Sequence, residues 1–94
     1  MKIVFDPKAW DEYTLLLNEN WRKAKKVNEL IEDIIHYGPL TGKGKPEALR
    51  NVFSGLFSRR IDEKNRLIYT ILHQENSEEK ELYILACHGH YEDK

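Results

Sequence analysis

The chain has 94 residues, enough for one domain with a single modest core, and we expect residues 1–94 to form one domain. Hydrophobic residues make up 40% of the chain, and its only cysteine, Cys87, excludes an intrachain disulfide. No apolar run approaches the ~20 residues that cross a bilayer, and a net charge of −1 does not mark a strongly basic nucleic-acid binder. We therefore predict a cytoplasmic protein without a membrane segment.

Charge is distributed unevenly along the chain. Residues 41–60 hold five basic residues and one acidic residue, a balance of +4, whereas residues 74–94 hold two basic and six acidic residues, a balance of −4. A basic middle can attract a polyanion locally even when the whole chain is close to neutral.

The N-terminal part predicts a short strand followed by a helical hairpin. Residues 2–5 are mostly apolar, after which Asp6 offers an N-cap oxygen and Pro7 suits the first helical position. A break near Asn20 should separate the two helices, and Gly38 should end the second. Three- and four-residue spacing predicts the buried faces, which are Trp10, Tyr13, Leu16 and Leu17 on the first helix, and Trp21, Ala24, Val27, Leu30, Ile31, Ile34 and Ile35 on the second.

The remainder of the chain predicts a sheet. Residues 52–61 and 66–72 are rich in β-branched and aromatic residues and flank a polar turn, which indicates a β-hairpin. Residues 82–87 form a near-continuous apolar run, typical of an inner strand. The order β-α-α-β-β-β predicts an α+β fold in which an N-terminal strand and a helical hairpin pack on a mostly antiparallel sheet of four to five strands.

Four polar residues with complementary chemistry arrive at the edges of this sheet: Glu47, Arg60, Arg66 and His90. A carboxylate can take the proton of a ribose 2′-hydroxyl, and a guanidinium can stabilise charge on the attacked phosphorus. A protonated imidazole can donate to the leaving 5′ oxygen, and Tyr91 adds an aromatic face or a phenol. These are the groups that metal-free RNA cleavage requires.

Each of these residues also has a purely structural interpretation. Glu47 could form a surface ion pair with Lys45 or Arg50, and Arg66 could pair with a carboxylate of the 62–65 turn. The turn length also leaves the strand register open. A four-residue turn would place Arg66 opposite the residue after Arg60, whereas a three-residue turn would place it opposite Arg60 itself.

Neither a metal nor a nucleotide cofactor is predicted. His88 and His90 would project from the same strand face, but no carboxylate or cysteine lies at a convincing third-ligand spacing. The glycine loop at residues 42–44 lacks the Lys-Ser/Thr ending of a phosphate-binding P-loop and does not follow a strand.

Several motifs together resemble one family of proteins. They are residues 42–49 (GKGKPEAL), 54–61 (SGLFSRRI) and 66–69 (RLIY), the pairs Ala86-Cys87 and His90-Tyr91, and, in the N-terminal half, Trp10-Asp11, Tyr13 and residues 26–31 (KVNELI). Nearly the whole chain resembles the YoeB (Txe) toxins of the RelE/ParE superfamily, which are mRNA interferases working on ribosome-bound message in the A site. The chain departs from that pattern in a longer last hairpin at residues 74–80, in Gly89, and in residues 92–94 beyond the tyrosine.

The resemblance implies a RelE-like fold and an endoribonuclease that needs no metal and leaves a 2′,3′-cyclic phosphate. It implies four catalytic residues, with Glu47 as general base, Arg66 as the phosphate-stabilising cation, His90 as general acid and Tyr91 as a support for substrate or acid. It further implies that four cations contact RNA phosphates, namely Lys45, Arg50, Arg59 and Arg60.

The partners that the resemblance implies are an antitoxin of the YefM (Phd) type and the bacterial ribosome with its A-site mRNA, and a homodimer stays open. The alternative is a non-catalytic toxin on the same RelE/ParE fold that binds a protein such as gyrase. A complete proton-transfer set favours the enzyme, because a binding surface has no need of it.

Overall fold

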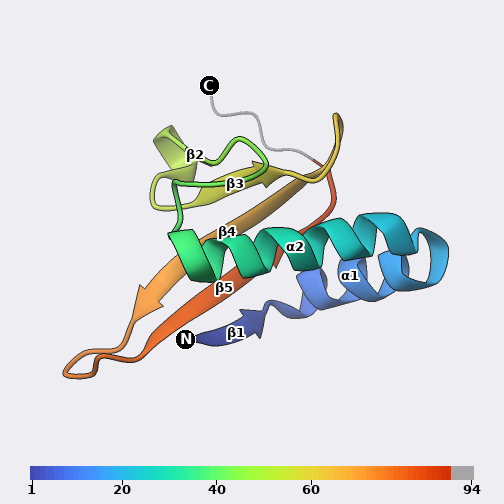
Figure 1. Ribbon diagram of the computed structural model, residues 1–94. Helices are drawn as coiled ribbons and strands as arrows, with labels where there is room; N and C mark the ends of the chain where they lie inside the picture. The colour runs from blue at the N-terminus through green and yellow to red at the C-terminus, as the bar shows by residue number, and fades with distance from the viewer. Residues whose placement is uncertain (90–94) are drawn as a thin grey trace.

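Five strands form one mixed sheet, and two helices cover one of its faces (Figure 1). The computed structural model describes residues 1–89. Its elements in chain order are β1 (Lys2–Phe5), α1 (Pro7–Glu19), α2 (Trp21–Tyr37), β2 (Glu47–Ala48), a 3₁₀ turn (Asn51–Phe53), β3 (Phe57–Arg60), β4 (Arg66–His73) and β5 (Lys80–Ala86). The strand order is β1-β5-β4-β3-β2, in which only the β1–β5 pair is parallel. The predicted α+β fold and the inner position of the last strand are confirmed.

The helices begin and end where local sequence directs them. The Asp6 carboxylate accepts a hydrogen bond from the Lys8 amide at 3.1 Å, and Pro7 follows at the first helical position. Asn20 ends α1 and starts α2, since its amide donates to the last turn of α1 and its carbonyl accepts from the first turn of α2. Gly38 ends α2 with a φ of +88°, a conformation that glycine adopts without a steric penalty.

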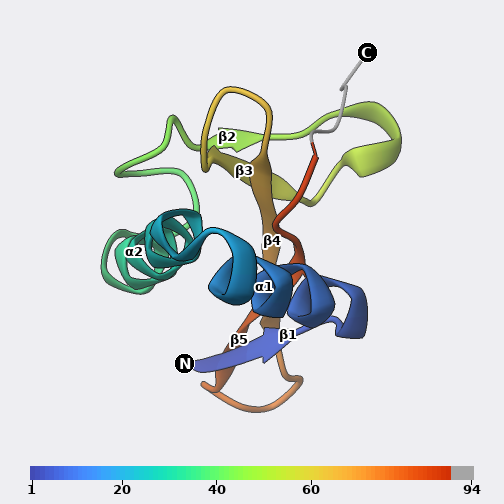
Figure 2. The same cartoon turned by 90° about the vertical axis from the view of Figure 1, so that its right-hand side faces the viewer.

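The larger core lies between the helices and the sheet. Val27, Leu30 and Ile34 of α2 are fully buried against β4 and β5, whose contributions to this core are Leu67, Tyr69, Leu82 and Ile84. Cys87 is buried in the same core, which confirms the predicted buried thiol. This burial raises the pKa of the thiol to about 12. Figure 2 shows α2 and the 3₁₀ turn on opposite sides of the sheet.

The predicted buried faces of the helices need one correction each. Trp10 and Leu17 of α1 are 50% and 47% exposed, and the residue fully buried on α1 is Ala9. The small side chain of Ala9 lets α1 lie close to the sheet with Ala9 on its inner face. Trp10 then lies at the rim of the core, where its ring packs edge-on against Phe5. Trp21 starts α2 and is 61% exposed, although the rest of the predicted α2 face is buried or partly buried.

The opposite face of the sheet carries a second, smaller core. The chain between β2 and β3 folds across this face, and the Leu49 amide donates to the Leu56 carbonyl at 2.9 Å. The residues of this core are Leu49, Ile68 and Ala86, with Phe53, Leu56 and Leu85 packed against them. The inner strands are therefore covered on both faces, as their continuous apolar sequences predict.

The predicted hairpin strand at residues 52–61 is too long. Only Phe57–Arg60 forms β3, and Val52 is 89% exposed in the 3₁₀ turn. Asn51 and Gly55 take φ values of +58° and +95°, which interrupt an extended chain. The β-branched and aromatic composition of the segment predicted a strand and gave no indication of these two left-handed residues.

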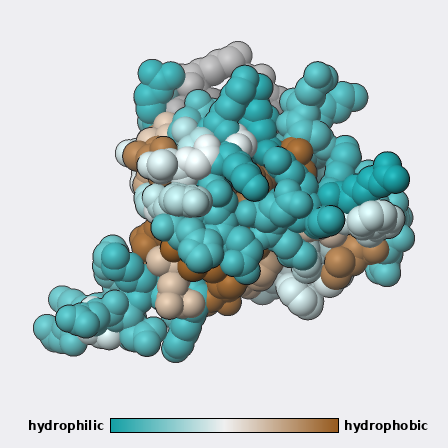
Figure 3. Space-filling model, in the orientation of Figure 1, coloured by the Kyte–Doolittle hydropathy of each residue, from teal (hydrophilic) through white to brown (hydrophobic). Residues whose placement is uncertain are grey.

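The surface around α2 is largely hydrophilic, and the tip of the β4–β5 hairpin projects from the body as a hydrophilic lobe (Figure 3). None of the helices within residues 1–89 is long and apolar enough to cross a membrane.

Candidate active site

The sheet face opposite the helices brings together three of the predicted site residues. Glu47 pairs with Ser58 across β2 and β3, and Arg60 pairs with Arg66 across β3 and β4. Cross-strand partners project to the same face, as do residues two apart on one strand. Of the two registers left open by the sequence, the structure therefore has the one that places Arg66 opposite Arg60. Ser58, which the sequence did not indicate, lies between Glu47 and these arginines.

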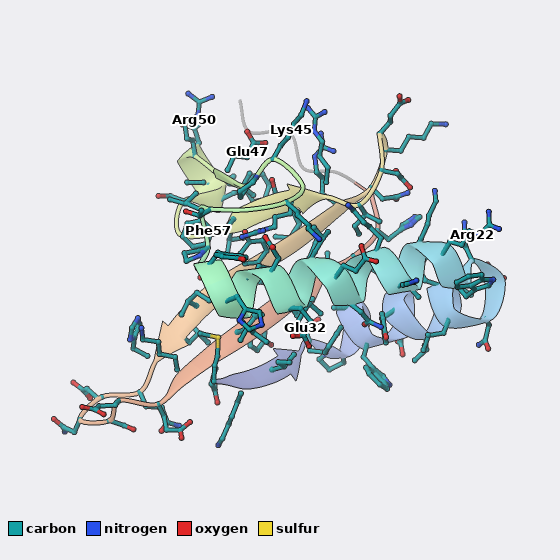
Figure 4. The ribbon with its side chains drawn as sticks, viewed as in Figure 1. Arg22, Glu32, Lys45, Glu47, Arg50 and Phe57 are labelled. Atoms are coloured by element: carbon teal, nitrogen blue, oxygen red, sulfur yellow. The ribbon has the colours of Figure 1, made fainter. Side chains whose placement is uncertain are left out.

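The direction of this face follows from the residue between Ser58 and Arg60. Arg59 points the other way, toward Asp33 of α2, so its neighbours project away from the helices. Figure 4 shows Lys45, Glu47 and Arg50 on that side of the sheet as well. The face thus gathers a carboxylate and several cations at the end of the molecule formed by β2 and β3.

Most of these side chains are accessible to a ligand. Glu47, Lys45, Arg50 and Arg60 are exposed, and Arg66 is half-buried. No ion pair joins Glu47 to Lys45 within the described chain. The arrangement can receive a phosphodiester, because guanidinium forks donate paired hydrogen bonds to phosphate oxygens.

The turn before Arg66 is built around the Asp62 carboxylate. It accepts hydrogen bonds from the amides of Lys64 and Asn65 and forms an ion pair with Lys23 of α2. Burial acts to raise the pKa of Asp62, but the hydrogen bonds from Lys23 and Asn65 outweigh it and hold that pKa well below its usual range. The Asp62 carboxylate is thus bound by Lys23 and the turn amides, and the Arg66 guanidinium donates instead to the Asp62 backbone carbonyl, at 3.4 Å.

Gly89, the residue before the predicted general acid His90, lies beside Arg66. The Gly89 carbonyl accepts from the Arg66 amide at 2.7 Å, and the Gly89 amide donates to the Asn65 side-chain oxygen at 2.8 Å. His90 and Tyr91 themselves lie outside the described residues.

The expectation that Arg59 contacts RNA phosphates is wrong. Its side chain has no exposed surface, and it forms an ion pair with Asp33 at 2.5 Å. All five guanidinium N–H groups are used, because Nε donates to the Tyr69 hydroxyl at 3.0 Å and the terminal nitrogens donate to Asp33 and to backbone carbonyls. Those carbonyls belong to Gly38 (2.8 Å), Thr41 (2.7 Å) and Lys43 (3.0 Å).

Asp33 and Tyr69 are the partners of Arg59 that sequence analysis missed. Asp33 lies within the apolar pattern of α2, next to Ile34, and a carboxylate at such a place signals a buried cationic partner. The backbone hydrogen bond from Lys43, together with the Arg59 guanidinium, holds the pKa of Asp33 below its usual range against the opposing effect of burial. Burial raises the pKa of Tyr69, whose hydroxyl donates to the Pro39 carbonyl at 2.6 Å.

Asp33→Asn should make the protein less stable near neutral pH, and the loss should shrink in acid. A carboxyl group whose pKa is lowered by folding stabilises the folded state above its unfolded pKa, about 3.8, and that stabilisation is lost as the pH falls through the folded value. Melting temperatures of both proteins between pH 7 and pH 2 would measure this, with Asp11→Asn on exposed α1 as the control. A difference that does not vary with pH would contradict the ion pair.

Gly42→Ala should destabilise the protein more than Gly38→Ala. Both glycines have positive φ, so each substitution carries backbone strain of about 1–3 kcal/mol. A Cβ at Gly42 would also lie 1.8 Å from an Asp33 carboxylate oxygen, whereas a Cβ at Gly38 meets nothing within 4 Å. Chemical denaturation of the two variants measures the difference, and equal destabilisation would mean that the loop gives way at no cost.

Residues 1–89 contain no group of three or more histidine, cysteine or acidic side chains that could hold a metal ion. His88 is exposed beside Gly89, and its expected neighbour His90 is outside the described chain.

Comparison with solved structures first defines the class of protein. The fold is that of RelE/ParE-like toxins: YafQ from E. coli strain BL21(DE3) superposes with a TM-score of 0.69 over 94% of this chain and 91% of that one, and at 15% identity this likeness shows the fold alone. The "YoeB/ParE toxin from Agrobacterium tumefaciens" superposes with a TM-score of 0.89 at 33% identity, covering 97% of this chain and all of that one.

Sequence comparison then identifies the family. Residues 5–91 match the family model described as a YoeB-like toxin of bacterial type II toxin-antitoxin systems. "Toxin YoeB" of Escherichia coli strain K12 is 41% identical over 97% of this chain and its own full length, and "Toxin YoeB" of a Synechocystis strain is 37% identical over 98% of this chain and 99% of its own. The chain belongs to the family of YoeB-like toxins, and the resemblance noted from its motifs is confirmed.

Proposed function

We propose that this toxin is a metal-independent endoribonuclease that cleaves mRNA in the ribosomal A site and so stops translation. The observation that carries the proposal is that the exposed Glu47 carboxylate shares one sheet face with the Arg60 and Arg66 guanidiniums. A base placed near fixed cations suits attack of a 2′-hydroxyl on the adjacent phosphate, in which a proton leaves while negative charge grows on phosphorus.

The proposed reaction is an in-line transesterification. Glu47 takes the proton of the ribose 2′-hydroxyl, whose oxygen forms a bond to phosphorus while the bond to the 5′ oxygen breaks. Arg66 stabilises the charge on the phosphoryl oxygens, and His90, supported by Tyr91, donates a proton to the leaving 5′ oxygen. The products are a 2′,3′-cyclic phosphate and a 5′-hydroxyl. Lys45, Arg50 and Arg60 contact neighbouring phosphates, and the buried Arg59 has no part in that contact.

The charge of the chain supports dependence on the ribosome. With a net charge of −1, the toxin would bind free RNA weakly, because few of its cations are left unopposed to neutralise phosphates. A message already held in the A site needs only to be cut, because the ribosome supplies its position.

The proposed partners follow those named for relatives. A YoeB–YefM complex from Staphylococcus aureus is described as a heterotetramer, and a YoeB dimer from the same organism is known; the complex superposes on this chain with a TM-score of 0.83 at 36% identity. We propose a YefM-type antitoxin and a homodimer for this toxin also.

Mapping of 5′ ends on a defined message in a purified translation system tests the proposal. New ends should occur at A-site codons, and only when ribosomes are present. Absence of cleavage by folded protein would refute the proposed reaction and point to a non-catalytic toxin, for which gyrase would be the first protein target to assay.

A further inference from the structure

We propose that Arg59, Asp33 and Tyr69 form a buried polar clamp whose task is to fix the 38–45 segment and, through it, the position of Glu47. The inference rests on the proposed function of Glu47 as the base. The three clamp residues come from β3, α2 and β4, so the clamp ties the segment to both layers of the fold.

The clamp holds the segment by its backbone. Carbonyl groups of residues 38, 41 and 43 accept from Arg59, the carbonyl of Pro39 accepts from Tyr69, and the Lys43 amide donates to Asp33 at 2.8 Å. Five backbone groups within six residues are thus bound to three side chains. Such a pattern fixes the path of the chain independently of the side chains that the segment carries.

Burial of apolar side chains does not hold the middle of this segment, residues 40–43. Leu40 is 53% exposed, and the residues from 40 to 43 all face solvent. The segment also adopts backbone angles that it would not keep unaided, since φ is +119° at Gly42, +82° at Gly44 and +51° at Lys45. A positive φ is uncommon for a residue other than glycine, so Lys45 needs a restraint from its surroundings.

Glu47, the first residue of β2, follows the 38–45 segment after one further residue. The Gly44 carbonyl accepts from the Arg60 amide at 2.6 Å, which joins the end of the segment to β3. β2 itself is only two residues long, Glu47–Ala48, so its ladder with β3 is a weak anchor. Leu49 anchors the chain on the far side of Glu47, so the approach through residues 38–45 is the second support that sets where the Glu47 carboxylate lies relative to Arg60 and Arg66.

Two conservative substitutions test this role. Tyr69→Phe removes the hydroxyl that links Arg59 to Pro39 but keeps the ring that packs against Phe57. Arg59→Lys keeps a positive charge beside Asp33 but loses the five-donor fork. Tyr83→Phe is the matched control, because it removes a partly buried hydroxyl that binds Asp6, far from the segment.

The first readout is steady-state cleavage of ribosome-bound message. A displacement of about 1 Å at a catalytic group can cost about 10²-fold in rate, so we expect kcat to fall at least tenfold for Tyr69→Phe and Arg59→Lys. The KM for programmed ribosomes should stay within about twofold, because the exposed cations are kept, and Tyr83→Phe should match the wild type. Folded clamp variants with wild-type kcat would overturn the inference.

The second readout does not depend on activity. Hydrogen exchange of the Lys43 amide, followed by NMR in the free toxin, should quicken at least tenfold in both clamp variants and stay unchanged in Tyr83→Phe. If the wild type cleaves no message but this exchange behaves as stated, the clamp stands and the proposed function of Glu47 fails. If the exchange is unchanged, the clamp itself is refuted, whatever the activity.

Discussion

Glu47→Gln should reduce cleavage of ribosome-bound message by about 10²- to 10⁴-fold, the range that a positioned general base supplies. The substitution keeps the size of the side chain and removes only its ability to take a proton. Glu47 is exposed at the start of β2 and its side chain makes no hydrogen bond within the described chain, so stability should be unchanged. The measurement is single-turnover cleavage with saturating toxin, together with circular dichroism to confirm folding.

The matched control for that experiment is Glu79→Gln at the tip of the β4–β5 hairpin, where the same chemical change should leave cleavage at the wild-type rate. Arg66→Ala should lose about 10²- to 10³-fold, as expected when one group that stabilises transition-state charge is removed. Because the two residues serve the same step, the double variant should lose less than the product of the two single losses. Full activity of folded Glu47→Gln would exclude it as the base.

Ile34→Asp should unfold the toxin. Ile34 has no exposed surface and packs in the core between α2 and the sheet. Truncating a buried isoleucine costs about 2–5 kcal/mol, and the buried carboxylate adds a desolvation cost. Small domains have only about 5–15 kcal/mol of stability in total, so the variant should lack a cooperative thermal transition above room temperature.

Trp21→Asp is the control on the same helix. The sequence predicted Trp21 on the buried face, yet it is 61% exposed, so this change should lower the free energy of unfolding by no more than about 0.5 kcal/mol. Denaturant titrations of both variants decide the matter. A native-like Ile34→Asp variant would contradict the observed packing of α2, and an unfolded Trp21→Asp variant would restore the prediction made from sequence.

The sequence determined the elements and the family because the signals for both are local. Asp6-Pro7 and Gly38-Pro39 set helix ends through capping and backbone angles that depend on adjacent residues only. The spacing of apolar residues in α2 reported its buried face, apart from Trp21, because a helix repeats every 3.6 residues whatever it packs against. The motifs around Glu47, Arg66 and His90 indicated the family in the same way, and Glu47 and Arg66 lie on one face in the structure.

The tertiary structure alone decided the roles of the arginines. Arg59 and Arg60 are neighbours of the same type on a predicted strand, so they should face opposite ways, but the sequence does not say which of the two faces the helices cover. Strand alternation sends one into the core, where Asp33 from a helix 26 residues earlier neutralises it, and the other to the surface opposite Arg66. The charge of a side chain is set by its residue type. Its burial and its ion pairs depend on which distant segments contact it, and those contacts are set only when the helices pack on the sheet.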